Sequence, residues 1–230
     1  MRLGISIWSD IACPWCFVGK ARLAQALELA AARGTPVTAD IRWRAFELDP
    51  RPKSETERQQ HYAERLANKL GRPRQEIEQM VATMAGHIRD AGLEADFLKL
   101  IPANTFDAHR LIQWAGDLDR QPESEGGAQQ RVTEALMRGY LGAGLDLQSH
   151  EALLALVAGL EFDGAEAAAV LADGRYGERV RADEQEAQRL GISGVPFFVI
   201  DRYGLSGAQP PEAFLQVFDT VREERRSAQA

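Results

Sequence analysis

The sequence has no hydrophobic run long enough to cross a bilayer. Its longest apolar stretch, residues 152–160, is about half the length of a spanning helix. The first residues also lack the apolar core and the small-residue cleavage site of a secretory signal. We therefore expect a cytoplasmic protein without membrane contact. Its 230 residues, 45% of them hydrophobic, are enough to form a core without disulfides or metals.

Basic charge is also scarce. Lysine and arginine total 27 against 34 aspartates and glutamates, which gives a formal net charge of −7. The arginine cluster at residues 222–226 is interleaved with glutamates and forms no basic stripe. Because nucleic-acid binding depends on cations that displace counterions from phosphates, the composition gives no reason to expect a nucleic-acid partner.

Only two cysteines are present, and both lie in the tetrapeptide Cys-Pro-Trp-Cys, at Cys13 and Cys16. A disulfide between them would close a loop of about four residues, which stabilises a fold by only about 2 kcal/mol before strain. The cytosol also keeps ordinary disulfides reduced. The pair therefore indicates chemistry rather than structural support.

The hydrophobic pattern divides the chain into three parts. Residues 3–8 and 37–46 have the composition of strands and flank a helical pattern at 16–32, which predicts a βαβ unit. The next block, to residue 159, repeats helical spacing from a capping box at Ser54 and Glu57 onward. The last part contains two helical segments, a short strand, its hairpin partner and a final helix, at residues 164–171, 175–190, 197–200, 203–206 and from Pro210 onward.

Each end of the chain supplies only part of a sheet, so we predict that the two ends pair. The result is an α/β fold in which residues 1–52 and 160–230 form one discontinuous domain. Residues 53–159 then form a large all-helical insertion between the N-terminal βαβ and the C-terminal ββα unit.

The position of the two cysteines, between a strand and a helix, supports a reactive role. A thiol at a helix N-terminus meets free backbone N–H groups and the positive end of the helix dipole, and both stabilise a thiolate. We expect Cys13 to be exposed and to attack, and Cys16, one turn further on, to resolve the mixed disulfide. Pro14 fits the first turn of the helix, and Trp15 offers substrates a partly exposed apolar contact.

Two other interpretations of the cysteine pair stay open: half of a zinc site, and a spacing without chemistry. A zinc site needs four ligands, and the histidines lack the pair spacing of metal sites; they are His61, His87, His109 and His150. We expect no metal, and we place all of these histidines except His109 at the surface. Trp8, Trp43 and Trp114 are expected in the core.

A second signal lies far along the chain, where Val195 and Pro196 precede a predicted strand. Proline cannot donate a ladder hydrogen bond, so its position at the start of a strand needs a reason. One interpretation is a trans proline that ends the preceding segment. The other is a cis proline beside the cysteines, which leaves the Val195 backbone free to pair with an extended substrate.

Four segments together resemble the DsbA-like thioredoxin superfamily, and within it the cytosolic FrnE-like branch: residues 9–20, 104–111, 191–198 and 205–209. The resemblance covers essentially the whole chain. It implies a thioredoxin fold with a helical insertion, a redox-active pair at Cys13 and Cys16, and a cis proline, Pro196, that faces them. Some members of the branch have a second cysteine pair near the C-terminus, which this chain lacks.

The superfamily also includes proteins without the cysteines, namely 2-hydroxychromene-2-carboxylate isomerases and kappa-class glutathione transferases. The resemblance implies that those proteins have a serine where Cys13 stands and bind glutathione beside the cis proline. Both cysteines are present here, which favours redox chemistry. A glutathione-dependent transferase or isomerase is the alternative function. A redox-inactive protein whose helices hold a small ligand is a third.

The segment around residue 105 has two interpretations. From the residues alone, Asn104 or Thr105 begins a helix, and His109 and Arg110 are exposed. The resemblance instead places the segment in the lining of a cavity above the cysteines. There Asn104 and His109 would contact the substrate, and a cationic His109 or Arg110 would favour the Cys13 thiolate.

The predicted activity is thiol–disulfide exchange between Cys13 and a thiol or disulfide of a protein or of a small molecule such as glutathione. Pro196, the Val195 backbone, Pro14 and Trp15 are predicted to position the partner. The step needs no cofactor, and glutathione is a candidate co-substrate. The direction of electron flow and the choice between monomer and homodimer stay open.

Overall fold

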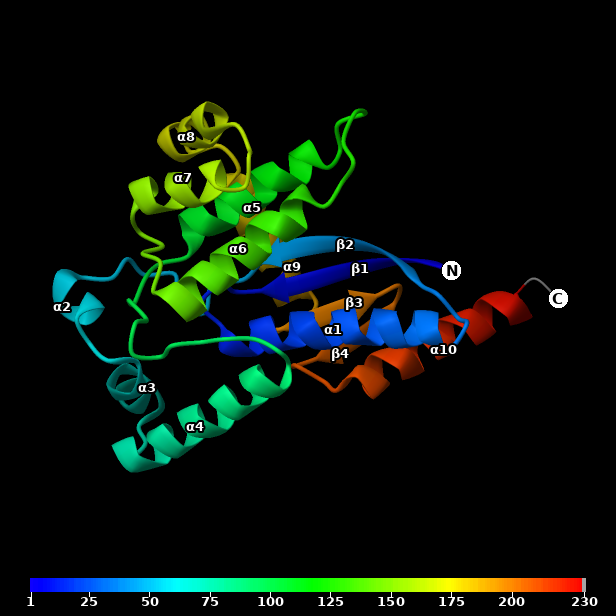
Figure 1. The fold of residues 1–230 in the computed structure, drawn as a ribbon, viewed down its shortest axis with the longest axis horizontal. Coiled ribbons are helices and arrows are strands. Elements are labelled where there is room, and N and C mark those ends of the chain that lie inside the picture. Colours follow the sequence, from blue (N-terminus) through cyan, green and yellow to red (C-terminus); the bar gives the residue numbers. More distant parts are fainter. Residues whose placement is uncertain (229–230) are drawn as a thin grey trace.

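Both ends of the chain contribute to one four-stranded sheet. The computed structural model describes residues 1–228, and its sheet has the strand order β2-β1-β3-β4 (Figure 1). The strands are β1 (Arg2–Ser9), β2 (Thr38–Ala45), β3 (Phe197–Ile200) and β4 (Tyr203–Ser206). β1 pairs in parallel with β2 and antiparallel with β3, so the predicted joining of the two ends into one sheet is confirmed.

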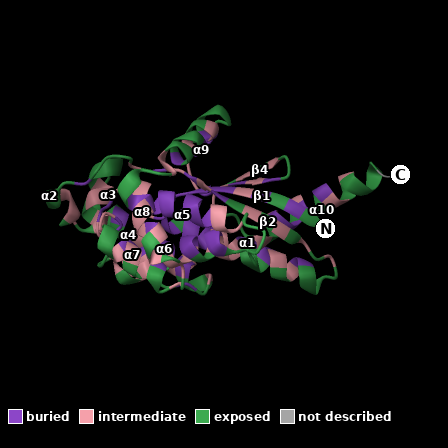
Figure 2. Cartoon of the chain, turned by 90° about the horizontal axis from the view of Figure 1, so that it is seen from above, coloured by how far each residue is buried: buried purple, intermediate pink, exposed green. Residues whose placement is uncertain are grey.

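Helices lie on both sides of the sheet. α1 (Pro14–Ala32) and α10 (Pro211–Ser227) pack against each other on one side, whereas α9 (Gly177–Arg189) lies on the other side, against β2 (Figure 2). α1 crosses from the end of β1 to the start of β2, which is the connection that two parallel neighbouring strands require. The reactive turn at the start of α1 therefore lies at the carboxyl end of the central strand β1.

A helical block lies between β2 and α9, as predicted, but it extends beyond the predicted end at residue 159 to residue 173. Its helices are α2 (Glu55–Arg58), α3 (Tyr62–Leu70), α4 (Arg74–Asp90), α5 (Phe106–Leu118), α6 (Ala128–Ala143), α7 (His150–Ala158) and α8 (Gly164–Asp173). α5 packs against α6, α8 and α9, while α3 and α4 form a separate pair that contacts α1. α8 also packs against α7. The division of domains between residues 159 and 160 stays a prediction.

A continuous hydrophobic core joins the sheet to the helical block. Trp8, Trp43 and Trp114 are all buried, as predicted. The capping box at Ser54 and Glu57 is confirmed, because each residue's side chain bonds the other's backbone N–H. No helix within residues 1–228 is both long and apolar enough to span a membrane.

Candidate functional site

The two cysteines lie where β1 ends and α1 begins. Cys13 precedes the first helical residue in an extended conformation, and Pro14 occupies the first position of the helix. The Cys13 N–H donates to the carbonyl of Asp10 (3.1 Å), and the Cys16 N–H donates to the carbonyl of Cys13 (3.0 Å). A tight turn therefore places Cys13 at the N-terminus of α1, and Cys16 lies within the first turn of this helix.

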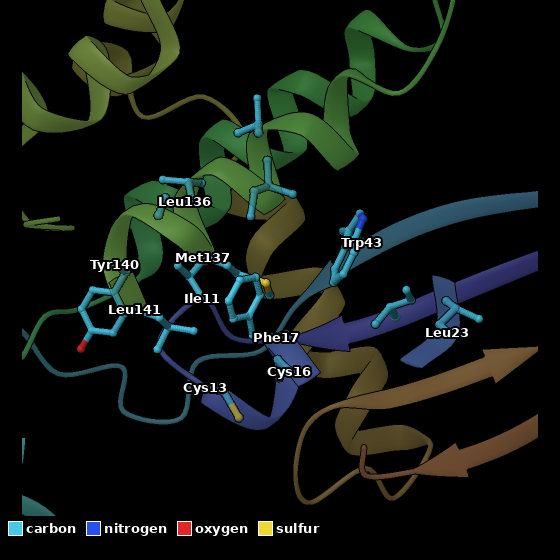
Figure 3. Packing of buried hydrophobic residues seen from close by; sticks show 14 of the residues in the cluster. Ile11, Cys13, Cys16, Phe17, Leu23, Trp43, Leu136, Met137, Tyr140 and Leu141 are labelled. Carbon is cyan, nitrogen blue, oxygen red and sulfur yellow. The ribbon is translucent and has the colours of Figure 1, made fainter. Parts of the chain in front are cut away.

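The expectation of an exposed Cys13 is wrong: its exposed fraction is only 5%, against 1% for Cys16. Cys13 is buried because it packs within the hydrophobic core and the Val195 carbonyl lies against its sulfur. The two thiols still differ. Cys13 lines that cavity, whereas Cys16 points into the core beside Phe17 (Figure 3). Burial raises the pKa of the Cys16 thiol well above its usual value, and the neighbouring Cys13 raises it further.

The loop before β3 closes over Cys13. The Val195–Pro196 peptide bond is cis, and the Cys13 thiol lies 3.6 Å from the carbonyl oxygen of Val195, to which it donates. The Pro196 carbonyl accepts from the N–H of Gly207 (2.8 Å), which ties the loop to the end of β4. Pro196 also packs directly on Gly19 of α1, where an added Cβ would lie 2.9 Å from Cγ of the proline.

A cavity of about 910 Å³ opens beside Cys13. Its walls come from the cysteine turn, the loop after β2, α3, α4 and the segment before α5. Pro14 and Trp15 both line it, and Trp15 has an exposed fraction of 37%, as its predicted contact role requires. The Trp15 ring packs on the ring of His87, with centroids 5.3 Å apart. His87 is therefore half-buried beside the site, not on the surface as predicted, whereas His61 and His150 are exposed.

The segment before α5 agrees with the first interpretation in one respect: Thr105 is the residue directly before the helix, at its N-cap. Asn104 accepts from the N–H of Phe106 (2.9 Å), so it does help to begin the helix, and its amide donates to Glu47 (2.7 Å). His109 and Arg110 are 2% and 3% exposed, so the expectation that they lie on the surface is wrong. They are buried because α5 is packed on several sides by α6, α8 and α9.

The cavity wall includes Thr105 but, within residues 1–228, neither Asn104 nor His109. Arg110 donates to carbonyl oxygens at Leu171 and Arg175, so it joins α5 to the end of α8. A substrate contact by Asn104 or His109 stays a prediction.

The sequence reasoning missed Asp10, which lies directly under the reactive turn. Asp10 is 2% exposed, and its carboxylate accepts from the N–H groups of Ala12 (3.2 Å) and Leu48 (2.8 Å). It thereby fastens the cysteine turn to the loop after β2. His109 Nε2 lies 3.7 Å from the same carboxylate and has no hydrogen-bond partner in the described part of the chain. The only local signal for Asp10 is its place just ahead of the cysteines.

A second buried acid, Asp183 on α9, supports the end of β2. Its carboxylate accepts from the Ala45 N–H (3.0 Å), Arg44 (2.8 Å) and Gln113 (2.8 Å). Burial raises the pKa of the Asp183 carboxyl in spite of these bonds. No sequence pattern could locate this network, since its members come from three distant elements. Within the described residues 1–228, no group of three acidic, histidine or cysteine side chains is arranged to hold a metal ion.

A helix that begins at a cysteine pair, and a cis proline directly before the neighbouring strand of the same sheet, define the fold as thioredoxin-like. The chain belongs to the DSBA-like thioredoxin domain family, whose model matches residues 4–219. No protein of known, curated function matches the chain.

Three solved structures place the chain within this fold. A probable DsbA oxidoreductase from Streptomyces coelicolor is 36% identical, with a TM-score of 0.80 over 96% of this chain and 91% of that one. A 2-hydroxychromene-2-carboxylate isomerase is 16% identical, with a TM-score of 0.64 over 98% of each chain. The cytosolic disulfide reductase DsbM from Pseudomonas aeruginosa is 19% identical, with a TM-score of 0.53 over 99% of this chain and 100% of that one. The last two likenesses concern the fold alone.

Proposed function

We propose that the chain is a thiol–disulfide oxidoreductase in which Cys13 exchanges with the substrate and Cys16 resolves the mixed disulfide. One observation supports this more than any other. The Cys13 sulfur lies at the wall of a large cavity and against the Val195 carbonyl, while Cys16 is buried one turn behind it. This arrangement gives a substrate sulfur access to one cysteine only.

In the reductive direction, the Cys13 thiolate attacks one sulfur of a substrate disulfide, and the other sulfur leaves as a thiolate. A mixed disulfide joins Cys13 to the first sulfur. Cys16 then loses its proton, attacks the Cys13 sulfur and releases the second substrate thiolate, so two electrons pass to the substrate. Because burial raises the pKa of the Cys16 thiol, its deprotonation belongs to this second step. Oxidation of a substrate dithiol is the same sequence in reverse.

Pro196 and the Val195 backbone are proposed to position the substrate, with Pro14 and Trp15 on the opposite side of Cys13. No bound cofactor takes part in the exchange. The DsbM neighbour is described as cytosolic and has also been solved with GSH. Both descriptions support a cytoplasmic location for this chain and glutathione as one of its exchange partners.

The test is to trap the intermediate. The Cys16→Ala variant, incubated with glutathione disulfide or an oxidised protein substrate, should accumulate one mixed disulfide at Cys13, which intact-mass and peptide mass spectrometry detect. The Cys13→Ala variant is the matched control and should accumulate none. Wild-type protein should accelerate the reduction of insulin by dithiothreitol. If neither the trapped species nor the acceleration is observed, the proposal is wrong.

The same experiment addresses the alternative of a glutathione-dependent transferase or isomerase. Such an enzyme would bind glutathione without a covalent bond to Cys13, and it would keep its activity when Cys16 is replaced. The presence of a cysteine at position 13 supports the redox assignment.

A further inference from the structure

The wall of the cavity that α3 forms contains cations without acidic partners. Arg65 and Lys69 lie one helical turn apart on α3, and both line the cavity. Among the residues that the structure describes, neither forms an ion pair with a carboxylate, in contrast to the nearby pairs of Arg72 with Glu76 and Lys53 with Asp49. The Lys69 ammonium reaches only a backbone carbonyl, at 3.4 Å.

The other charges of the cavity are already satisfied. Asp49 forms ion pairs with both Lys53 (2.6 Å) and Arg51 (3.1 Å). Glu57 belongs to the capping box of α2. Asp10 accepts two backbone N–H groups. Arg65 and Lys69 are therefore the cations of the cavity wall that lack a carboxylate partner among the residues that the structure describes.

Arg65 is the more enclosed of the two cations. Its Nε is buried and has no hydrogen-bond partner within residues 1–228, and its guanidinium lies over the ring of Tyr62, 5.5 Å from the centroid. Tyr62, Arg65 and Cys13 all line the same cavity. Burial raises the pKa of the Tyr62 hydroxyl, so its ring stays neutral beside the guanidinium. A buried guanidinium N–H that lacks an acceptor costs free energy, which a ligand acceptor would recover.

A carboxylate is the ligand group that matches such a guanidinium, because its two oxygens accept the paired N–H donors of arginine. The rest of the cavity suits a small organic molecule, since it is large and its walls include the apolar side chains of Leu66, Met80 and Met84. On this basis, we propose that the cavity selects disulfides and thiols that bear a carboxylate, and that Arg65 binds this carboxylate while Cys13 exchanges with the sulfur. The inference rests on the proposed thiol–disulfide exchange at Cys13.

The test compares three disulfides of similar size that differ in charge. They are 3,3′-dithiodipropionate (anionic), bis(2-hydroxyethyl) disulfide (neutral) and cystamine (cationic). Rate constants for mixed-disulfide formation at Cys13 are measured by quenched flow in the Cys16→Ala background, and each is divided by the rate of the same disulfide with free 2-mercaptoethanol. The ratio of the anionic to the neutral rate isolates recognition of charge, because any effect of Arg65 on the reactivity of Cys13 cancels.

The normalised rate for the anionic disulfide should exceed that for the neutral disulfide when Arg65 is present. The ratio of these two rates should fall about tenfold or more in Arg65→Gln, as expected for the loss of a charge-assisted hydrogen bond. Arg65→Lys should retain part of the preference. Arg74→Gln is the matched control, because Arg74 is an exposed residue that pairs with Glu78 and lies outside the cavity wall; it should leave the ratio unchanged. The neutral disulfide reports in every variant whether the site is intact.

The outcomes separate the two proposals. If none of the three disulfides reacts with Cys13, the proposed function itself is wrong. If all three react and Arg65→Gln leaves the normalised ratio as it was, exchange at Cys13 stands and the carboxylate site is refuted. A second series, with one, two or three methylene groups between sulfur and carboxylate, should show a maximum at the length that joins Cys13 to Arg65. A flat series would also contradict the assignment.

Discussion

Two glycines inside helices should respond in opposite ways to the same substitution. Gly86 lies within α4, and a Cβ added there would meet nothing within 4 Å. Gly19 lies within α1, and its added Cβ would lie 2.9 Å from Pro196 Cγ and 3.1 Å from Phe198 Cζ. Neither the proline ring nor the fully buried phenylalanine can swing away, so the contact cannot be relieved by a rotamer change.

The magnitudes follow from two opposing effects. Replacing glycine by alanine in a helix interior gains up to about 1 kcal/mol of stability. Gly86→Ala should therefore raise the free energy of unfolding by about 0.5–1 kcal/mol. Overpacking a filled core costs about 1–3 kcal/mol, so Gly19→Ala should lose about 1 kcal/mol after the helical gain. For a chain of this size, 1 kcal/mol corresponds to about 2–4 °C in Tm.

Urea unfolding of the reduced proteins, followed by circular dichroism, measures both changes. Gly19→Ala should also slow mixed-disulfide formation with bis(2-hydroxyethyl) disulfide, because the added methyl group displaces Pro196 and the Val195 carbonyl from the Cys13 sulfur. Gly86→Ala should leave that rate unchanged. If Gly19→Ala stabilises the protein as much as Gly86→Ala does, the packing of Pro196 on α1 is looser than described, and the reasoning fails.

Three further predictions concern the cysteines, a partly buried ion pair and a left-handed turn. Iodoacetamide should modify Cys13 well before Cys16, because burial raises the Cys16 pKa and hides its sulfur; equal labelling in peptide mass spectra would contradict this. Arg58 lowers the Asp146 pKa, so the pair stabilises the fold above about pH 4 and loses its effect as the pH falls below that value. Asp146→Asn should cost about 0.2–1 kcal/mol in urea unfolding at pH 7, and an undiminished cost at pH 3 would refute the assignment. Gly144→Ala should cost about 2–4 kcal/mol, since φ is +71° and the new Cβ would lie 2.5 Å from a carbonyl oxygen; a neutral effect on Tm would contradict the geometry.

The sequence was most informative where structure depends on neighbours along the chain. Strand β1, the reactive turn and α1 follow from local hydrophobic spacing and from Pro14 at the first helical position. The pairing of β1 with β3 could also be predicted, because two incomplete sheets at the two ends of a chain leave strand edges that need partners. The resemblance then added the facing proline, which no local pattern could place beside Cys13.

The burial of polar side chains could not be predicted in this way. His109 and Arg110 lie near the start of α5, where the sequence resembles the first turn of a solvent-exposed helix. In the structure, however, α5 is the most buried helix of the insertion. Arg110 is satisfied by carbonyl oxygens of Val170, Leu171 and Arg175, some 60 residues away in sequence. The same limit applies to Cys13, because Val195 lies far along the sequence and only the tertiary arrangement brings its carbonyl to the Cys13 sulfur.

The reacting groups and the groups proposed to select the substrate come from different parts of the chain. Cys13 and Cys16 belong to the first βαβ unit and Pro196 to the loop before β3, whereas Arg65 and the apolar side chains of Leu66, Met80 and Met84 belong to helices of the insertion. α3 and α4 contact the sheet domain mainly through α1, so substitutions within them can change the cavity without moving the two sulfurs. Variants of α3 should therefore alter which disulfides react, whereas variants of the α1–Pro196 contact should alter how fast all of them react. The Arg65 and Gly19 variants, assayed with the same three disulfides, separate these two effects: the first changes the ratio of rates and the second changes every rate by the same factor.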